Sequence, residues 1–351
     1  MSGRESTTAA NRISYLSLAN VIAAIAVITL HTNGCFWSFS TDHYWYTANI
    51  VESFFYFAVP FFFMITGALL LDFYDKYSIT EYFKKRIKKT VIPFIAWTFI
   101  GIAYRIWVAK NLTTEDVSLR YIFDALTKFN IINLFWFFGP LFCVYLSIPL
   151  LASIPKEKRN TVYLYTAVAS VILNVLVPFI NSVFSLDIAC PLSVSVGSGY
   201  LFYVLVGYLI THNDLKILVR IAAYILSVAG LLMHVVGTYK LSMEAGAING
   251  LYKGYNNIPC ILYSVGLFIA VKHVSRYVNC KFFLRGVTFI GDYTFPMYLM
   301  QWFFIDAVSR FTHINTYSLY YRLGAPIPIA LLIILISWVL RKIPLVKHIV
   351  P

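Results

Sequence analysis

The sequence YLSLANVIAAIAVITL, residues 15–30, contains no charged side chain and is followed directly by His31. At 1.5 Å per residue, a helix from Tyr15 to His31 covers roughly 24 Å, most of the apolar thickness of a bilayer. The stretch therefore predicts a membrane-spanning helix with His31 near one end. Asn20 lies eleven residues before His31, so the two share a helix face roughly 16 Å apart. Ala23 and Ala24 between them allow close approach to that face.

The composition of the 351-residue chain indicates that lipid is its main surroundings. Hydrophobic residues make up 60% of the chain and charged residues 12%, whereas soluble globular proteins carry about 25% charged residues. Arg4 and Arg12 precede the first apolar stretch, as in a signal peptide. However, the stretch is longer than the apolar region of a signal peptide, and no small-x-small cleavage site follows it. We therefore expect a retained transmembrane helix.

Hydropathy along the chain predicts an all-α, polytopic integral membrane protein with about ten transmembrane helices. No internal repeat is visible and no linker is long enough to separate two domains, so we expect one membrane domain, residues 1–351. The expected spans are 14–32, 47–71, 90–108, 133–153, 161–182, 197–211, 217–238, 257–273, 288–309 and 324–341.

The basic residues fall unevenly on the loops between these spans. With the amino terminus inside, 20 of the 28 Lys and Arg residues lie on inner segments, which predicts cytoplasmic N and C termini. The other eight are Arg105, Lys110, Arg120, Lys128, Lys240, Lys253, Arg310 and Arg322. This bias explains most of the net charge of +13 and argues against nucleic-acid binding, which needs the cations on one solvated face. We expect a multi-pass protein of the cell (inner or plasma) membrane.

Four ionisable residues lie in or at the edge of apolar spans, where charge is costly and therefore informative: His31, Glu52, His234 and Asp292. Glu52 begins the second span, which runs in the opposite direction, so it is expected at a depth close to His31. A carboxylate there would orient the imidazole and stabilise its protonated form, as in general-base catalysis. The alternative is that both side chains lie in the hydrated interface. His234 has no evident partner and is expected to be packed or interfacial.

The segment YFKKRIKKTVIPF, residues 82–94, places five cations within six residues directly before the third span. An ordinary membrane anchor or a patch for anionic lipids explains such a cluster. The alternative is a binding site for a phosphorylated cytoplasmic molecule, with Arg86 and Lys89 in contact with phosphate. Charge density alone does not separate the two.

Other chemistries have no support in the sequence. The five cysteines are scattered and form no CxxC pair, which argues against a zinc or redox site, so no metal is expected. The chain also lacks a P-loop, a GxSxG elbow, an HExxH motif and a Rossmann glycine pattern.

Several segments, in order along nearly the whole chain, resemble the acyltransferase-3 family of membrane acyltransferases, which modify bacterial cell-surface glycans. They are the first helix ending in His31, VPFFFMITGALLL (59–71), KKRIKKTVIPF (84–94), NLFWFFGPLFCVYLSIPLL (133–151), FYVLVGYLI (202–210) and FIGDYTFPMYLMQ (289–301). The chain departs from the family pattern at Asn20, where an Arg is usual, at Gln301, which replaces a late His, and at Thr294, which replaces a Ser. An RxxxR-like element is present only as Lys85 and Lys89 with Arg86 adjacent.

The resemblance implies an O-acyltransferase, in the first place an O-acetyltransferase. It implies that acyl-CoA binds from the cytoplasm with its phosphates on Lys85, Arg86, Lys88 and Lys89. His31, oriented by Glu52, would take the proton from a hydroxyl of an extracytoplasmic cell-envelope glycan. The expected substrate pocket includes Asn20, Trp136, Tyr298 and Gln301. With no fused extracytoplasmic domain expected, the protein would act alone or pass its acyl group to a separate partner.

Two other interpretations fit the same residues. A transporter or flippase for lipid-linked saccharides would use the cations as a route for polyanions and would not depend on acyl-CoA. A catalytically inactive sensor or scaffold of the same fold is compatible with Asn20 and Gln301.

Overall fold

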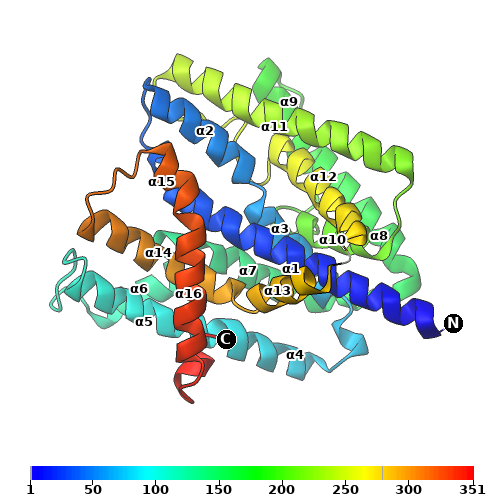
Figure 1. The fold of residues 1–351 in the computed structure, drawn as a ribbon. Helices are drawn as coiled ribbons and strands as arrows, with labels where there is room; N and C mark the ends of the chain where they lie inside the picture. Colours follow the sequence, from blue (N-terminus) through cyan, green and yellow to red (C-terminus); the bar gives the residue numbers. More distant parts are fainter. Residues whose placement is uncertain (1, 279) are drawn as a thin grey trace.

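A computed structural model describes residues 2–278 and 280–351, with side chains from Tyr15 onward. The predicted all-α class is confirmed, because the described residues form helices and loops and contain no β-strand (Figure 1). The side chains of Arg4 and Arg12 lie outside the described residues.

The α-helices of the first half are α1 (Ser2–Thr32), α2 (His43–Phe55), α3 (Ala58–Leu70), α4 (Ile79–Arg86), α5 (Ile92–Trp107), α6 (Leu119–Lys128), α7 (Phe138–Ala152) and α8 (Lys156–Ser170). Those of the second half are α9 (Val177–Phe184), α10 (Tyr200–His212), α11 (Ile217–Ala245), α12 (Ile258–Val274), α13 (Lys281–Gly291), α14 (Thr294–Phe311), α15 (Leu319–Gly324) and α16 (Pro326–Leu340). Two π-helical segments, η3 (Ile87–Val91) and η5 (Val171–Leu176), join α4 to α5 and α8 to α9. Short 3₁₀ turns are η1 (Gly34–Trp37), η2 (Phe73–Asp75), η4 (Asn133–Phe137), η6 (Ser275–Tyr277) and η7 (Val346–His348).

Eight helical stretches of the described residues are long and apolar enough to cross a membrane. They match eight of the ten predicted spans. The sixth predicted span corresponds to α10, an apolar helix of only 13 residues. The ninth is divided between the end of α13 and α14, and α14 contains Asp306 and Arg310. The structure thus supports a multi-pass membrane protein, with these two helices below the usual length or hydropathy of a span.

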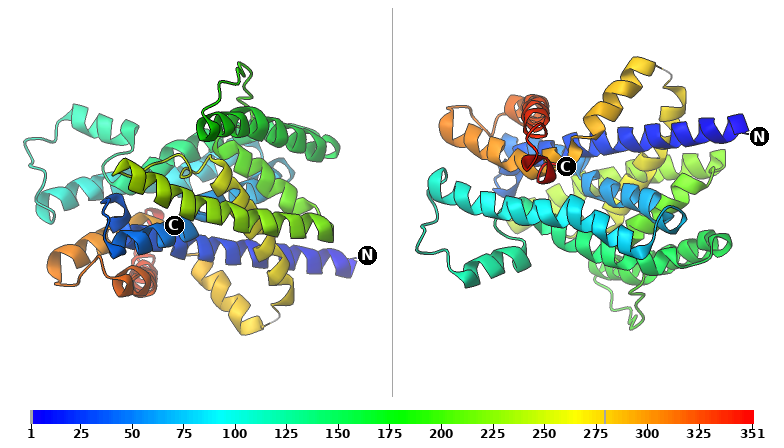
Figure 2. Two further views of the ribbon diagram at one scale, coloured as in Figure 1. Left: turned by 90° about the horizontal axis from the view of Figure 1, so that it is seen from above. Right: turned by 90° about the horizontal axis from the view of Figure 1, so that it is seen from below.

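Helix α1 lies at the centre of the bundle, as its blue ribbon shows in Figure 1. It packs against α2, α3, α12, α13, α14, α15 and α16. Ala19, Ala23 and Ala26 are at most 1% exposed, because small side chains let these neighbours approach closely. By contrast, α6 extends away from the bundle at one end (Figure 2).

The short helix α10 is held against α3 through two glycines. A Cβ atom on Gly67 would lie 1.9 Å from the main-chain oxygen of Val204, and one on Gly207 would lie 2.1 Å from that of Met64. The two backbones therefore touch at both places, which only glycine allows. This contact places α10 inside the protein rather than against lipid.

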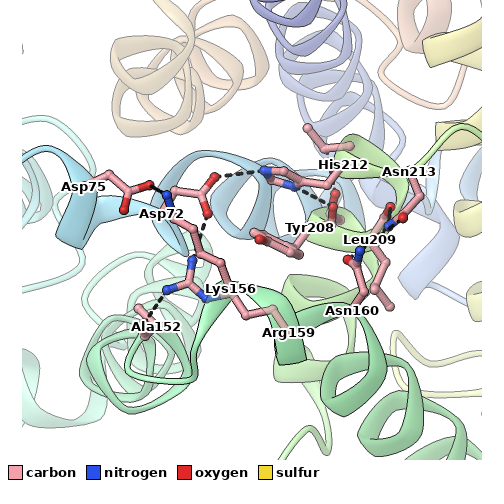
Figure 3. A network of polar contacts seen from close by, with 12 residues as sticks. Asp72, Asp75, Ala152, Lys156, Arg159, Asn160, Tyr208, Leu209, His212 and Asn213 are labelled. Carbon is pink, nitrogen blue, oxygen red and sulfur yellow. Dashed lines mark hydrogen bonds and ion pairs between the residues drawn. The ribbon is translucent and has the colours of Figure 1, made fainter.

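A buried polar network joins the loop after α3 to α8 and α10 (Figure 3). Arg159 is 4% exposed and donates from Nη1 to Asp72 Oδ1 at 3.0 Å and from Nε to the main-chain oxygen of Ile154 at 2.8 Å. The other carboxylate oxygen of Asp72 lies 2.8 Å from His212 Nε2. This network fixes one end of the bundle and lies outside the cavity described next.

Candidate active site

A cavity of about 550 Å³ lies beside α1. His31 at the end of α1 and Asn20 near its middle both line it. The cavity therefore follows this helix for roughly 16 Å, the length of eleven helical residues. Trp136 of η4 and Tyr298 of α14 also line it. The structure thus brings together His31 and three of the four residues predicted for the substrate pocket.

The fourth, Gln301, is fully buried and contacts His31 directly. Its Oε1 lies 3.2 Å from His31 Nδ1, and its Nε2 donates to the main-chain oxygen of Tyr298 at 3.4 Å. Because an amide oxygen only accepts hydrogen bonds, Nδ1 of the neutral imidazole carries the proton and Nε2 keeps its lone pair. Nε2 is therefore the nitrogen able to accept a proton from a bound hydroxyl group.

Asn20 connects α1 to the junction between α13 and α14. Its Nδ2 donates to Thr294 Oγ1 at 2.8 Å, and Thr294 Oγ1 donates to the main-chain oxygen of Gly291 at 2.9 Å. Asp292 and Thr294 at this junction line the cavity together with Asn20. The amide of Asn20 therefore holds one wall of the cavity in place.

One wall of the cavity is a stack of aromatic rings. Tyr255, from the loop between α11 and α12, lies between Tyr56 and Trp136, with ring centroids 4.2 Å and 5.7 Å away and interplanar angles of 5° and 19°. Tyr298 donates to the main-chain oxygen of Leu134 at 2.6 Å and so fastens α14 to the turn that carries Trp136. Tyr255 is not predictable from the sequence, because a loop tyrosine in a chain with 26 tyrosines gives no distinguishing pattern.

The predicted phosphate-binding cluster is only partly at the cavity. Of its four cations, Lys89 lines the cavity, and Arg86 lies 5.4 Å from the ring centroid of Tyr145, which also lines it. Lys85 and Lys88 do not line the cavity, and Lys85 lies over another tyrosine ring. Successive residues of a helix point about 100° apart, so four nearly consecutive side chains do not share one face.

Arg341, directly after α16, supplies a second cation to the same cavity. It donates to the main-chain oxygens of Asp292 at 2.7 Å, Val350 at 3.0 Å and Pro351 at 2.6 Å. Pro351 lines the same cavity as Lys89 and Arg341. From the sequence, Arg341 is predicted only as an inner-face charge, because no local motif distinguishes it from its neighbour Lys342.

The prediction that Glu52 orients His31 is not what the structure shows. Glu52 Oε1 lies 2.9 Å from Lys253 Nζ, and each side chain is 4% exposed. Glu52 Oε2 accepts from Asn33 Nδ2 at 3.4 Å. Glu52 and His31 are at the ends of consecutive spans, but equal depth does not fix the rotation of each helix about its axis. The carboxylate therefore faces the loop after α11 and not the imidazole.

Through these contacts Glu52 supports the site indirectly. Lys253 lies 3.7 Å from the ring centroid of Tyr56, which stacks on Tyr255 of the cavity wall. Burial lowers the pKa of Lys253 from its ordinary value, and the adjacent Glu52 carboxylate opposes that decrease. The ion pair therefore holds the loop that carries Tyr255.

The end of α1 that carries His31 is fixed by a second buried cation. Arg322 is 1% exposed and donates from Nη1 to Asn33 Oδ1 at 3.1 Å and from Nη2 to Thr47 Oγ1 at 2.7 Å. Its main-chain oxygen accepts from Thr32 Oγ1 at 2.8 Å. Arg322 thus joins α15 to the two residues that follow His31.

The remaining candidates lie apart from the cavity. His234 is fully buried, and its ring packs edge-on against Tyr56 at 5.0 Å between centroids, as expected for a packed histidine. All five cysteines are free thiols. Among the described residues, no group of three or more His, Cys, Asp or Glu side chains is placed to hold a metal ion.

The membrane-spanning helices and the cavity between them define a multi-pass membrane protein with an internal binding site. The profile of the acyltransferase-3 family, described as an acyltransferase domain, matches residues 13–342. Because this match covers nearly the whole chain, the chain belongs to the acyltransferase-3 family and is a membrane acyltransferase. No curated protein and no solved structure matches it.

Proposed function

We propose that the protein is a multi-pass O-acyltransferase of the cell membrane. It takes an acyl group from cytoplasmic acyl-CoA, in the first place acetyl-CoA, and transfers it to a hydroxyl group of an extracytoplasmic cell-envelope glycan. His31 is the general base of this reaction. Both termini are cytoplasmic in this arrangement, as the distribution of basic residues predicts.

One observation carries the proposal: a single cavity is lined by His31 and by the cations Lys89 and Arg341. An acyl-CoA carries its phosphates and its thioester at opposite ends of an extended arm. Lys89 and Arg341 offer charge-assisted hydrogen bonds to phosphate, and the side of the cavity along α1 leads towards His31. An apolar cavity with a few polar groups at separate places suits such a substrate.

The chemistry follows from the tautomer of His31. With Nδ1–H held by Gln301, His31 Nε2 accepts the proton of the acceptor hydroxyl as its oxygen attacks the thioester carbonyl. The C–O bond forms, the C–S bond breaks, and the thiolate of CoA takes the proton back from the imidazolium. No net charge is left, so His31 returns to its starting form.

The first test compares acyl transfer by the wild type with transfer by His31→Ala. The purified protein in detergent receives radiolabelled acetyl-CoA as donor and a crude envelope-glycan fraction as acceptor. We expect the rate to fall by at least about 10²-fold in His31→Ala, the usual contribution of a general base. His43→Ala, at an exposed position at the start of α2, is the matched control and should retain activity.

Equal transfer by the wild type and His31→Ala would overturn the role of His31. No transfer by either protein, together with no acetyl-CoA binding by calorimetry, would favour a transporter of lipid-linked saccharides instead.

The donor end of the cavity has its own test. Lys89→Gln should raise the KM for acetyl-CoA by at least about 10-fold, because a hydrogen bond to a charged group contributes about 1.5–3 kcal/mol. Lys88→Gln removes the same charge from the neighbouring exposed residue, outside the cavity, and should leave KM within about 2-fold, as for an exposed charge. Equal effects of the two variants would mean that only the overall charge of the segment matters.

A further inference from the structure

A small pocket lies between the end of α10, the start of α11 and the end of α12. Its basic lining residues are Arg220, Lys272, His273 and Arg276. None of the residues that line it also lines the cavity beside α1. This pocket is therefore separate from the proposed active site.

The pocket has an excess of positive charge. Among the residues whose side chains are described, Asp214 is the carboxylate that pairs there, with Arg276 and, at 3.8 Å, with Lys272, and its side chain is 80% exposed. Within this described part, three permanent cations and one carboxylate give a charge of +2 before His273 is counted. Lys272 also donates to the main-chain oxygens of Ile210 at 2.6 Å and Asn213 at 2.9 Å. This lysine therefore fixes the wall formed by the end of α10.

Arg220 is a half-buried cation with an unusual environment. Its Nη1 lies 2.5 Å from His273 Nδ1, and its Nε is buried and has no hydrogen-bond partner among the described residues. Buried donors without acceptors are destabilising, and an anion that accepts from them removes this cost.

The pocket lies at the boundary of the membrane. Arg220 is in the first turn of α11 and His273 in the last turn of α12, and both helices are candidate spans. Beyond the first turn, α11 presents exposed apolar side chains, including Ile221 (45%), Ile225 (65%) and Val228 (58%). An apolar surface thus runs from the basic pocket along the membrane-spanning part of the helix.

We propose that this pocket binds the phosphate of an anionic phospholipid, whose acyl chains lie along the exposed apolar surface of α11. Basic pockets between transmembrane helices at the cytoplasmic side suit such headgroups. Arg220 and Arg276 donate to the phosphate oxygens, and the neutral ring of His273 holds Arg220 in place by accepting at Nδ1. The site does not depend on acyl transfer.

The test is a lipid titration of the purified full chain in neutral detergent, followed by its thermal unfolding midpoint. Phosphatidylglycerol, phosphatidylcholine and inorganic phosphate are added separately. We expect phosphatidylglycerol to raise the midpoint and the other two to have little effect at equal phosphate concentration. In Arg220→Gln and His273→Gln, the concentration of phosphatidylglycerol for half of the shift should rise at least 10-fold.

Lys216→Gln is the matched control, because Lys216 is the exposed residue before α11 and does not line the pocket. It should titrate like the wild type. If Arg220→Gln does not fold, Arg220→Lys keeps the charge but loses the fork of donors and should show an intermediate shift. An equal response in Lys216→Gln and Arg220→Gln would overturn the site. A response to inorganic phosphate equal to that for phosphatidylglycerol would overturn the lipid and assign the pocket to a soluble phosphate.

Discussion

Replacing Glu52 by glutamine is expected to destabilise the protein by about 3 to 4.6 kcal/mol at pH 7, because it leaves a buried ammonium group without its counter-charge. Both side chains of the Glu52–Lys253 pair are 4% exposed, so water does not replace the carboxylate. The variant can avoid burying an unpaired charge if Lys253 loses its proton. From an unfolded-state pKa of about 10.4, this costs about 4.6 kcal/mol at pH 7, and this sets an upper limit.

The same reasoning gives a dependence on pH. Burial lowers the pKa of Lys253 in the folded state, and without Glu52 nothing opposes that decrease. The unfolded chain then binds more protons than the folded protein, so the stability of the variant rises with pH until the unfolded pKa is reached. The loss relative to the wild type should shrink as the pH rises, by at most about 1.4 kcal/mol per pH unit and at most about 2.7 kcal/mol between pH 7 and pH 9.

The assay is reversible denaturant unfolding of the protein in detergent at pH 7 and pH 9. Glu244→Gln, at an exposed position near the end of α11, is the control and should change stability by less than about 1 kcal/mol at either pH. The double variant Glu52→Gln/Lys253→Met should recover most of the stability, because it removes the buried ammonium group that Glu52→Gln leaves without a counter-charge. A loss below about 1 kcal/mol, or an equal loss at both pH values, would refute the reasoning from burial.

Three further expectations concern other parts of the structure. Gly207→Ala should destabilise the protein by about 1–3 kcal/mol or more in a thermal unfolding assay, because its Cβ would lie 2.1 Å from the main-chain oxygen of Met64. Gly286→Ala, with open space around it, is the control and should be neutral in that assay. Asp72→Asn should lower the free energy of unfolding by about 3 kcal/mol or more, measured with denaturant, because it leaves the buried Arg159 without its carboxylate. Asp75→Asn breaks an exposed pair and should lower it by less than about 1 kcal/mol. Similar decreases in the two variants would contradict the role of burial. Gln301→Met should lower kcat by about 10²-fold with little change in the KM for acetyl-CoA, because His31 loses the acceptor that fixes its tautomer. An unchanged kcat would show that catalysis does not use this contact.

The sequence predicts the fold class well because hydropathy and loop charge act over whole helices. Eight of the predicted spans correspond to helices able to cross a membrane. The helices at the other two predicted spans fall below the usual length or hydropathy of a span, for reasons that hydropathy from a single sequence does not capture. Helix α10 is short because it is enclosed by protein, and α14 tolerates Asp306 because this carboxylate accepts hydrogen bonds from Tyr104 and Arg310.

The site is predictable only where one helix carries the information. His31 and Asn20 share a face of α1 by their spacing, and both line the cavity. Contacts between distant segments are not accessible in this way. Lys253 pairs with Glu52 from a position 201 residues away, and Arg341 reaches the cavity from beyond the last helix. For Glu52, depth in the membrane was the only coordinate available, and the rotation of its helix decided the partner.

The close packing of α3 on α10 at Gly67 and Gly207 has a consequence for how the chain is made. The two glycines are about 140 residues apart, so at 5–20 residues per second roughly 7–28 s pass between their syntheses. During that interval the face of α3 that will receive α10 is complete but has no occupant from its own chain. Helix α10, at about 20 Å, is too short to cross the bilayer unaided. Insertion of α10 therefore depends on α3 being already inserted. When synthesis stalls between the two helices, we expect membrane quality control to recognise the uncovered face of α3.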